Sequence, residues 1–149
     1  MSKRGDLPFE ITLEVRDTCL CLHLQRAARA VARRFDAALR PVGLTSGQFS
    51  LLMSLNRPQA ASIGDVSALL AMDRTTLTAN LKPLQRRGLV IVTVDDADKR
   101  MRRLTLTSTG RAMLRAAVPL WRGTHAEIAR LLTVGSSPDR LRADLRELS

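Results

Sequence analysis

The sequence has few aromatic residues: it contains no tyrosine, one tryptophan and three phenylalanines. Proteins that bind single-stranded nucleic acid stack its bases on aromatic side chains, so this scarcity argues against that class of binding. The chain also lacks a run of about 18 apolar residues, which a membrane-spanning helix needs, and it does not begin with an apolar signal segment. We therefore expect a cytoplasmic protein.

Cysteine and histidine are equally scarce. Cys19 and Cys21 are the only cysteines, and their spacing suits no disulfide framework. They lie among leucines, which favours buried, reduced structural thiols. The two histidines, His23 and His125, have no carboxylate or thiol partners at ligand spacing, so we expect no metal site and no cofactor.

Signatures of the common enzyme classes are also missing. The chain has no Walker A sequence, dinucleotide-binding glycine pattern, nucleophile elbow or convincing acid–base pair. We therefore expect that it is not an enzyme.

Basic residues, in contrast, are in excess. The chain has 24 Lys and Arg against 14 Asp and Glu, for a formal net charge of +10. A surplus of this size predicts a polyanionic partner, either nucleic acid or anionic lipid, because binding releases counterions from the phosphates. The rest of the sequence has to distinguish these partners.

The apolar pattern predicts a largely helical chain. Apolar residues recur at spacings of three and four from Glu14 to Leu39, which predicts one long amphipathic helix. Thr45 can cap a second helix, Ser62 begins a capping-box sequence for a third, and Asp73 can cap a fourth. Their apolar faces indicate one shared core, and the length of the chain suits a single domain.

Beyond Gly88 the apolar period changes from helical to two. Residues 90–94 and 104–106 alternate around a charged turn at 95–100, which predicts a β-hairpin with an exposed tip. A further helix is expected from Ser108 to about residue 133, with a kink at its internal proline, and a short amphipathic helix follows at the end of the sequence.

Two short helices joined by a tight turn and followed by a hairpin make a winged helix-turn-helix, in which the second helix enters the major groove of DNA. Here that helix is expected from Asp73 to Arg87. Its Leu77, Leu81 and Leu84 turn inward, so the opposite face is exposed. The predicted DNA-binding residues are Arg74, Thr75, Thr76, Thr78, Lys82 and Arg86 on this helix, together with Asp98, Lys99, Arg100, Arg102 and Arg103 on the hairpin.

These residues are given different roles. The threonine hydroxyls are assigned to base edges or phosphates, and the basic residues of the helix mainly to phosphates, which position a protein without reading sequence. Arg100 at the hairpin tip is expected to enter the narrow minor groove. Asp98 is expected to orient Arg100 through a charge-assisted hydrogen bond. A solvated surface explains any single arginine as well, but it does not explain the whole set.

At these residues the sequence resembles the MarR family of transcriptional regulators. The resemblance lies in the run Asp73-Arg74-Thr75-Thr76-Leu77-Thr78, in Gly88-Leu89-Val90, and in Asp98-Lys99-Arg100 followed by Leu106-Thr107 and Gly110. The last pattern looks like the family's Asp-x-Arg wing signature. The sequence departs from the family at Ala79, where a basic residue is common, and at Pro83, which is expected to interrupt the recognition helix.

The resemblance implies a mainly α fold with a small β-hairpin wing, over a single domain 1–149. Residues 45–107 would form the winged helix-turn-helix lobe, and 14–40 and 108–149 would be dimerisation helices. It further implies a homodimeric repressor that binds a pseudo-palindromic operator in double-stranded DNA and is released by a small aromatic or phenolic effector. Phe49 and Trp121 are candidates to line the effector pocket, although core packing is the commoner role for such residues.

Three alternatives stay open. Charge alone would suffice for a general nucleic-acid-binding protein, and a winged fold can also serve as a protein-interaction adaptor. The third is a thiol-based redox sensor, because Cys21 falls where the hydroperoxide-sensing branch of the family carries its reactive thiol. That branch surrounds its cysteine with tyrosines, which this chain lacks.

Overall fold

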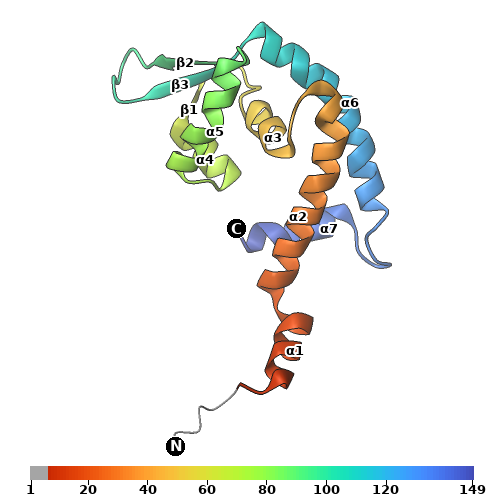
Figure 1. The fold of residues 1–149 in the computed structure, drawn as a ribbon. Coiled ribbons are helices and arrows are strands. Elements are labelled where there is room, and N and C mark those ends of the chain that lie inside the picture. Colours follow the sequence, from red (N-terminus) through yellow and green to blue (C-terminus); the bar gives the residue numbers. More distant parts are fainter. Residues whose placement is uncertain (1–6) are drawn as a thin grey trace, which may run out of the picture.

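The computed structural model describes residues 7–149, so the first six residues of the expected domain lie outside it (Figure 1). The chain is mainly helical with a small antiparallel sheet, as predicted. In chain order the elements are α1 (Phe9–Thr18), α2 (Leu20–Leu39), a short 3-10 turn η1 (Arg40–Val42), α3 (Ser46–Ser54), β1 (Ala61–Ser62), α4 (Ile63–Leu70), α5 (Arg74–Arg86), β2 (Val90–Val94), β3 (Arg102–Leu106), α6 (Ser108–Ala129) and α7 (Pro138–Glu147).

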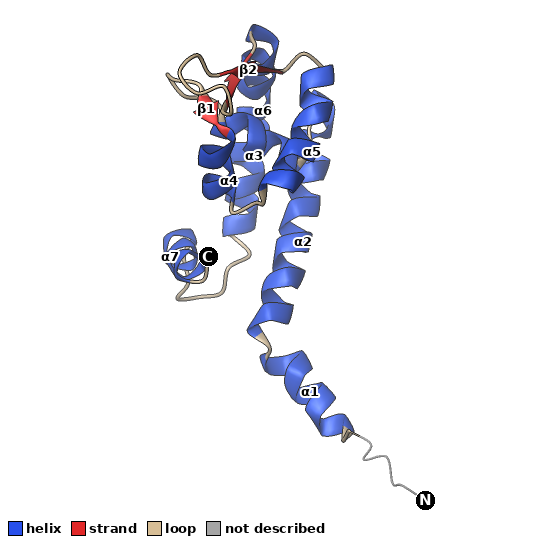
Figure 2. Ribbon diagram, turned by 90° about the vertical axis from the view of Figure 1, so that its left-hand side faces the viewer, coloured by secondary structure: helices blue, strands red, loops and turns tan. Residues whose placement is uncertain are grey.

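The elements form a compact lobe attached to long helices. Helices α3, α4 and α5 and the sheet gather at one end, and α2 and α6 pack along each other and lead away from it (Figure 1). Helix α1 continues beyond α2 at an angle and projects from the molecule (Figure 2). None of the described helices is both long and apolar enough to cross a membrane.

The predicted caps begin the helices of the lobe. Thr45 and Gln48 form a reciprocal capping box at α3, and Ser62 and Asp65 form one at α4. The Asp65 carboxylate accepts the backbone N–H of Ser62 at 3.0 Å, and this bond lowers the pKa of Asp65. Each box satisfies amides that the first helical turn leaves without partners.

The core that joins the lobe to α2 and α6 is built largely of leucine. Leu39 of α2, Leu52 of α3, Leu77 and Leu84 of α5, and Leu104 of β3 are fully buried. Burying each such side chain stabilises the fold by about 1.5–3 kcal/mol. The recognition helix is thereby fixed from its inner face.

The sheet has the strand order β1-β3-β2, and both pairings are antiparallel. The hairpin formed by β2 and β3 is the predicted wing. The short strand β1 was not predicted; Ala61 pairs with Leu104, far away along the chain. At the base of the wing, the Thr107 hydroxyl donates to the carbonyl of Gly88 at 2.7 Å and connects the hairpin to α6.

Two expectations about helix continuity are wrong. The helix predicted over 14–39 is divided at Cys19, which has extended backbone angles (φ −69°, ψ 109°), and the first part begins at Phe9. Conversely, Pro83 does not interrupt α5, which continues to Arg86. A proline in the last turns costs that helix one hydrogen bond, and the buried leucines on either side of Pro83 hold it in place.

Candidate nucleic-acid interface

Asp73 caps the N-terminus of the recognition helix α5. The Asp73 carboxylate accepts the backbone N–H of Thr76 at 2.8 Å and the Thr76 hydroxyl at 2.7 Å. These bonds lower the pKa of Asp73, so the cap is anionic at neutral pH. Before it, Ala71 has a left-handed backbone (φ 49°), which is the tight turn expected between α4 and α5.

All the predicted contact residues of α5 are exposed, whereas Leu77, Leu81 and Leu84 of the same helix are buried. Their hydroxyls are not equally available, however. The Thr78 hydroxyl donates to the carbonyl of Arg74 at 2.8 Å, and that of Thr76 donates to Asp73. In the described part of the chain, only Thr75 of the three has a hydroxyl without an intramolecular hydrogen bond. Thr76 and Thr78 therefore retain accepting capacity, whereas Thr75 can also donate.

The wing is held by an aspartate that sequence reasoning missed. Asp95 accepts the backbone N–H groups of Ala97 and Asp98, both at 2.9 Å, and the Nε–H of Arg103 at 2.6 Å. The bond from Arg103 is the main cause of the lowered pKa of Asp95. Arg103 is partly buried in this pair and braces the hairpin. The repeated Asp at the strand end, typical of a side-chain-capped turn, was the available signal.

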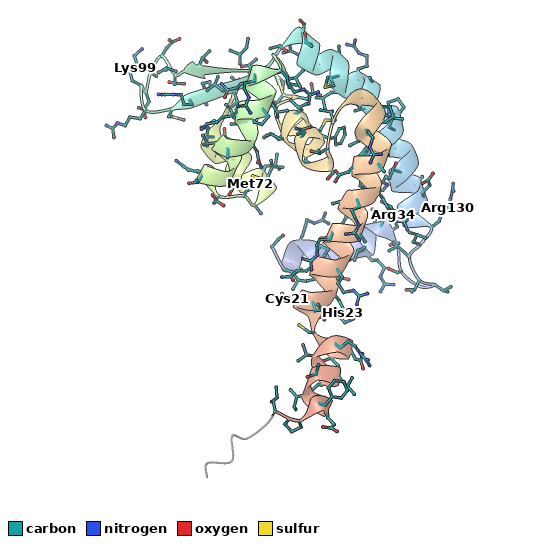
Figure 3. The ribbon with its side chains drawn as sticks, viewed as in Figure 1. Cys21, His23, Arg34, Met72, Lys99 and Arg130 are labelled. Carbon is teal, nitrogen blue, oxygen red and sulfur yellow. The ribbon has the colours of Figure 1, made fainter. Side chains whose placement is uncertain are left out.

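At the tip, the expected bond between Asp98 and the Arg100 guanidinium is not formed. Asp98 instead accepts the backbone N–H of Arg100 at 3.0 Å, which shapes the turn. Arg102 donates from Nη1 to the carbonyl of Lys99 at 3.1 Å. Lys99 lies at the outer end of the wing (Figure 3), and both Lys99 and Arg100 are exposed.

Three arginines from separate elements line one cavity of about 290 Å³ between the wing and α5. Arg74 comes from α5, and Arg100 and Arg102 come from the wing. The cavity also includes Gly64 in the first turn of α4, and a Cβ at that position would lie 3.3 Å from Nη2 of Arg74. Helix N-termini favour anions, so this cavity suits a phosphate group. The sequence predicted all three arginines as DNA-binding residues, but it did not predict that they line a common cavity.

A second cavity of about 520 Å³ separates the lobe from α6. Phe49 of α3 and Trp121 of α6 both line it, with their ring centroids 6.3 Å apart. Arg122 also lines it and is exposed. Phe49 and Trp121 thus stack on each other and also line this cavity.

A third, apolar groove of about 560 Å³ lies among α2, α6 and α7. Leu24, Val31 and Ile128 are part of its lining, and Leu141 and Leu145 contribute from α7. Helices α1 and α7 have no buried residues in the described chain. The groove therefore lies beside helices whose apolar side chains are largely uncovered.

Neither histidine belongs to a metal-binding cluster within residues 7–149, because no three His, Cys, Asp or Glu side chains are grouped there for one ion. His125 instead packs on the Trp121 ring, with centroids 5.3 Å apart. The expectation of two buried structural thiols is wrong for the described chain, because Cys21 is exposed and Cys19 only partly buried.

Comparison with known proteins agrees with this geometry. A family model described as MarR family matches residues 42–101. The transcriptional regulator MosR of M. tuberculosis, solved in complex with DNA, is 43% identical with a TM-score of 0.79, over 88% of this chain and 93% of that one. The transcriptional repressor CouR, bound to a 23-mer DNA duplex, is 30% identical with a TM-score of 0.72, over 97% and 96%.

Among curated proteins, the transcriptional activatory protein BadR of Rhodopseudomonas palustris is 32% identical over 113 residues, or 73% of this chain. That match spans 65% of BadR, slightly less than two thirds of its length.

Proposed function

Because this chain belongs to the MarR family of winged-helix transcriptional regulators, we propose that it binds a specific pseudo-palindromic site in duplex DNA as a homodimer. The observation that carries the proposal is the basic face of α5 and the wing, three of whose arginines line a common cavity. On this face Arg74, Lys82 and Arg100 are all exposed and are free of ion pairs with other described residues.

In this proposal α5 lies in the major groove. Thr75 donates to a base edge or phosphate, and Lys82 and Arg86 contact phosphates along the groove. Arg100, at the tip of the wing, enters the neighbouring minor groove, where the negative potential is strongest. The three-arginine cavity holds one backbone phosphate between α5 and the wing. Arg103, bound to Asp95, supports the wing without a direct contact.

The homodimer is supported by the uncovered apolar helices. Phe9 at the start of α1 is 67% exposed, and Leu20 at the start of α2 is 70% exposed. Apolar surface of this kind is stabilised by burial against a second copy. Residues 14–40 and 108–149 then form the dimer, and 45–107 form the DNA-binding lobe. Two recognition helices about 34 Å apart would meet successive turns of the same DNA face.

We further propose repression that is released by a small aromatic or phenolic effector. The cavity beside Phe49 and Trp121 joins α3 of the DNA-binding lobe to α6 of the dimerisation helices. Arg122 offers a cation to an anionic group of the ligand. A ligand that binds better to a dimer with misplaced recognition helices shifts the population away from the DNA-binding arrangement.

The experiment that tests the proposal is selection of random duplex DNA on the purified protein, near physiological salt, with the mass of the complex determined on the same preparation. An inverted repeat bound by a dimer is the expected result. Salt-sensitive binding without a preferred sequence would replace the proposal with general nucleic-acid binding. Failure to bind duplex DNA at all would favour a protein-interaction adaptor.

A further inference from the structure

Asp36 lies in the last turn of α2 and joins that helix to α3. Its carboxylate accepts the backbone N–H of Ser46, the first residue of α3, with 2.6 Å between Oδ1 and the nitrogen. The N–H groups in the first turn of a helix have no partner within that helix. A side chain of one helix therefore satisfies the start of another.

The Asp36 carboxylate makes this bond although arginines flank it. Asp36 is the only acidic residue of α2; Arg33 precedes it by three positions and Arg40 follows it by four, which are spacings at which opposite charges interact. Within the described residues, however, Asp36 forms no ion pair. The bond from the Ser46 backbone is the main cause of the lowered pKa of Asp36. The carboxylate is thus ionised at neutral pH, and its bond to α3 is charge-assisted.

The N-terminus of α3 also has a cap of its own. The Gln48 backbone N–H donates to Oγ1 of Thr45 at 3.2 Å, and the Thr45 backbone N–H donates to Oε1 of Gln48 at 3.1 Å. Local residues therefore begin α3, and Asp36 adds an attachment to α2. The two tasks, beginning the helix and fixing its position, belong to different side chains.

The chain between the two helices bends sharply. It contains η1 and then Gly43, whose backbone is left-handed (φ 71°). Leu39 of α2 and Leu52 of α3 are buried in one core, but apolar attraction has no preferred direction. A hydrogen bond, in contrast, restricts both a distance and an angle. The bond between Asp36 and Ser46 closes the bend and so restricts the angle between α2 and α3.

We propose that Asp36 positions the DNA-binding lobe on α2 and thereby sets the half-site spacing that the dimer prefers. Helix α3 packs on α4, and α4 packs on α5, so the angle of α3 is passed on to the recognition helix. The inference rests on the proposed function, in which α2 belongs to the dimer and α3 to the lobe. One base pair added between half-sites moves them apart by about 3.4 Å and turns them by about 35°. A lobe held at one angle discriminates between such sites, whereas a lobe free to turn adapts to them.

The test measures the affinity of the full chain for the selected inverted repeat, for versions with one base pair added or removed at its centre, and for a single half-site. The wild type should prefer the selected spacing. Asp36→Ala should reduce this preference by about tenfold, because a hydrogen bond to a charged group changes an equilibrium constant by about that factor or more. Asp36→Asn keeps the shape and an acceptor oxygen, so it should reduce the preference by a smaller factor. Affinity for the single half-site should stay unchanged in both variants.

Thr45→Ala is the matched control, because it removes the cap of α3 and leaves the bond from Ser46 to Asp36 in place. It should lower the stability of the fold and keep the spacing preference. Hydrogen exchange of the Ser46 amide, followed by NMR without DNA, reports on the bond itself. This exchange should be about tenfold faster in Asp36→Ala. If the alanine variant does not fold, Asp36→Asn carries both comparisons.

Three results would overturn the inference while the wild type still selects an inverted repeat, so that the proposed function stands. They are a Ser46 amide that exchanges equally fast in wild type and variant, a spacing preference that survives the loss of the Asp36 carboxylate, and an equal loss of preference in Thr45→Ala. If the wild type selects no inverted repeat, the proposed function fails and the spacing role fails with it. The exchange of Ser46 then still decides whether Asp36 joins the two helices.

Discussion

Asp95, directly after β2, and Arg103 of β3 join the two strands of the wing where they enter its tip, with 2.6 Å between Oδ2 and Nε. The same carboxylate holds two amides of the turn. One aspartate therefore holds both the two strands and the turn between them, and it engages the Nε of Arg103. The hydrogen bonds of Asp95 thus fix the turn that carries the exposed side chains of Lys99 and Arg100.

Asp95→Asn should weaken the wing in a pH-dependent way. The pKa of Asp95 is lowered in the folded protein, mainly by Arg103. A lowered pKa stabilises the fold above the unfolded value of about 3.9, and that contribution is lost as the pH falls through the lower, folded value. The difference in unfolding free energy between the wild type and the variant should thus be present at pH 7 and shrink below about pH 4. Asp96→Asn is the control, and an equal effect of both changes would contradict the role of Asp95.

Lys82→Ala and Arg100→Ala should each reduce the salt dependence of duplex binding. Each lost phosphate contact lowers the slope of log K against log salt by about 0.9. Arg130→Ala is a matched control, because Arg130 is an exposed residue at the far end of α6 from the wing (Figure 3). Binding titrations at four or five salt concentrations measure the slope. An unchanged slope in the first two variants would remove those residues from the interface.

Gly110→Ala should destabilise the fold. A Cβ at Gly110 would lie 2.3 Å from the carbonyl oxygen of Leu89, so backbone at the wing base must move. Such overpacking costs about 1–3 kcal/mol. Gly123→Ala, in the same helix with nothing within 4 Å of the added Cβ, should instead stabilise by about 0.5–1 kcal/mol. Urea unfolding of both variants checks the contrast, which would be refuted by two shifts of the same sign.

Leu145→Asp should shift the protein from dimer towards monomer, because Leu145 lines the apolar groove of α2, α6 and α7. Ile91→Asp is the matched control: Ile91 is also an exposed aliphatic side chain, but it lies on β2. Sedimentation at several protein concentrations gives the dissociation constant of each variant. If only Ile91→Asp weakened the dimer, the dimer interface would include the sheet and not the groove of α2, α6 and α7.

Binding of an effector should change the fluorescence of Trp121, which is the only tryptophan and lines the cavity beside Phe49. A panel of phenols and benzoates can be titrated with this signal. Compounds that alter it should also release DNA, and Arg122→Ala should weaken binding of the anionic members more than of the neutral ones. Ligands that release DNA without affecting Trp121 would place the effector site elsewhere.

The features that sequence reasoning anticipated correctly depend on near neighbours. Thr45, Ser62 and Asp73 cap their helices through residues three positions away, so their spacing is enough. The alternation of 90–94 and 104–106 likewise reflects one buried face of a hairpin. Such local patterns located the recognition helix and the wing within a few residues.

The features that were missed depend on distant or competing partners. Strand β1 exists because Ala61 meets Leu104, which no local pattern signals. From the sequence, either Asp95 or Asp98 could pair with an arginine of the wing. The strand register places Thr93 opposite Arg103, and this brings the Arg103 side chain to Asp95. At the division, the Cys19 sulfur accepts the backbone N–H of Leu22 as a cap of α2, and ordinary helix-stop signals do not include such a cap.

The central claim is that the basic face of α5 and the wing reads a particular DNA sequence. The most direct measurement is the ratio of dissociation constants for the selected inverted repeat and a scrambled duplex of equal length, taken at the same near-physiological salt. The account predicts a preference of about 10³ or more for the inverted repeat. Equal affinities for the two duplexes would contradict it and leave only charge-driven binding.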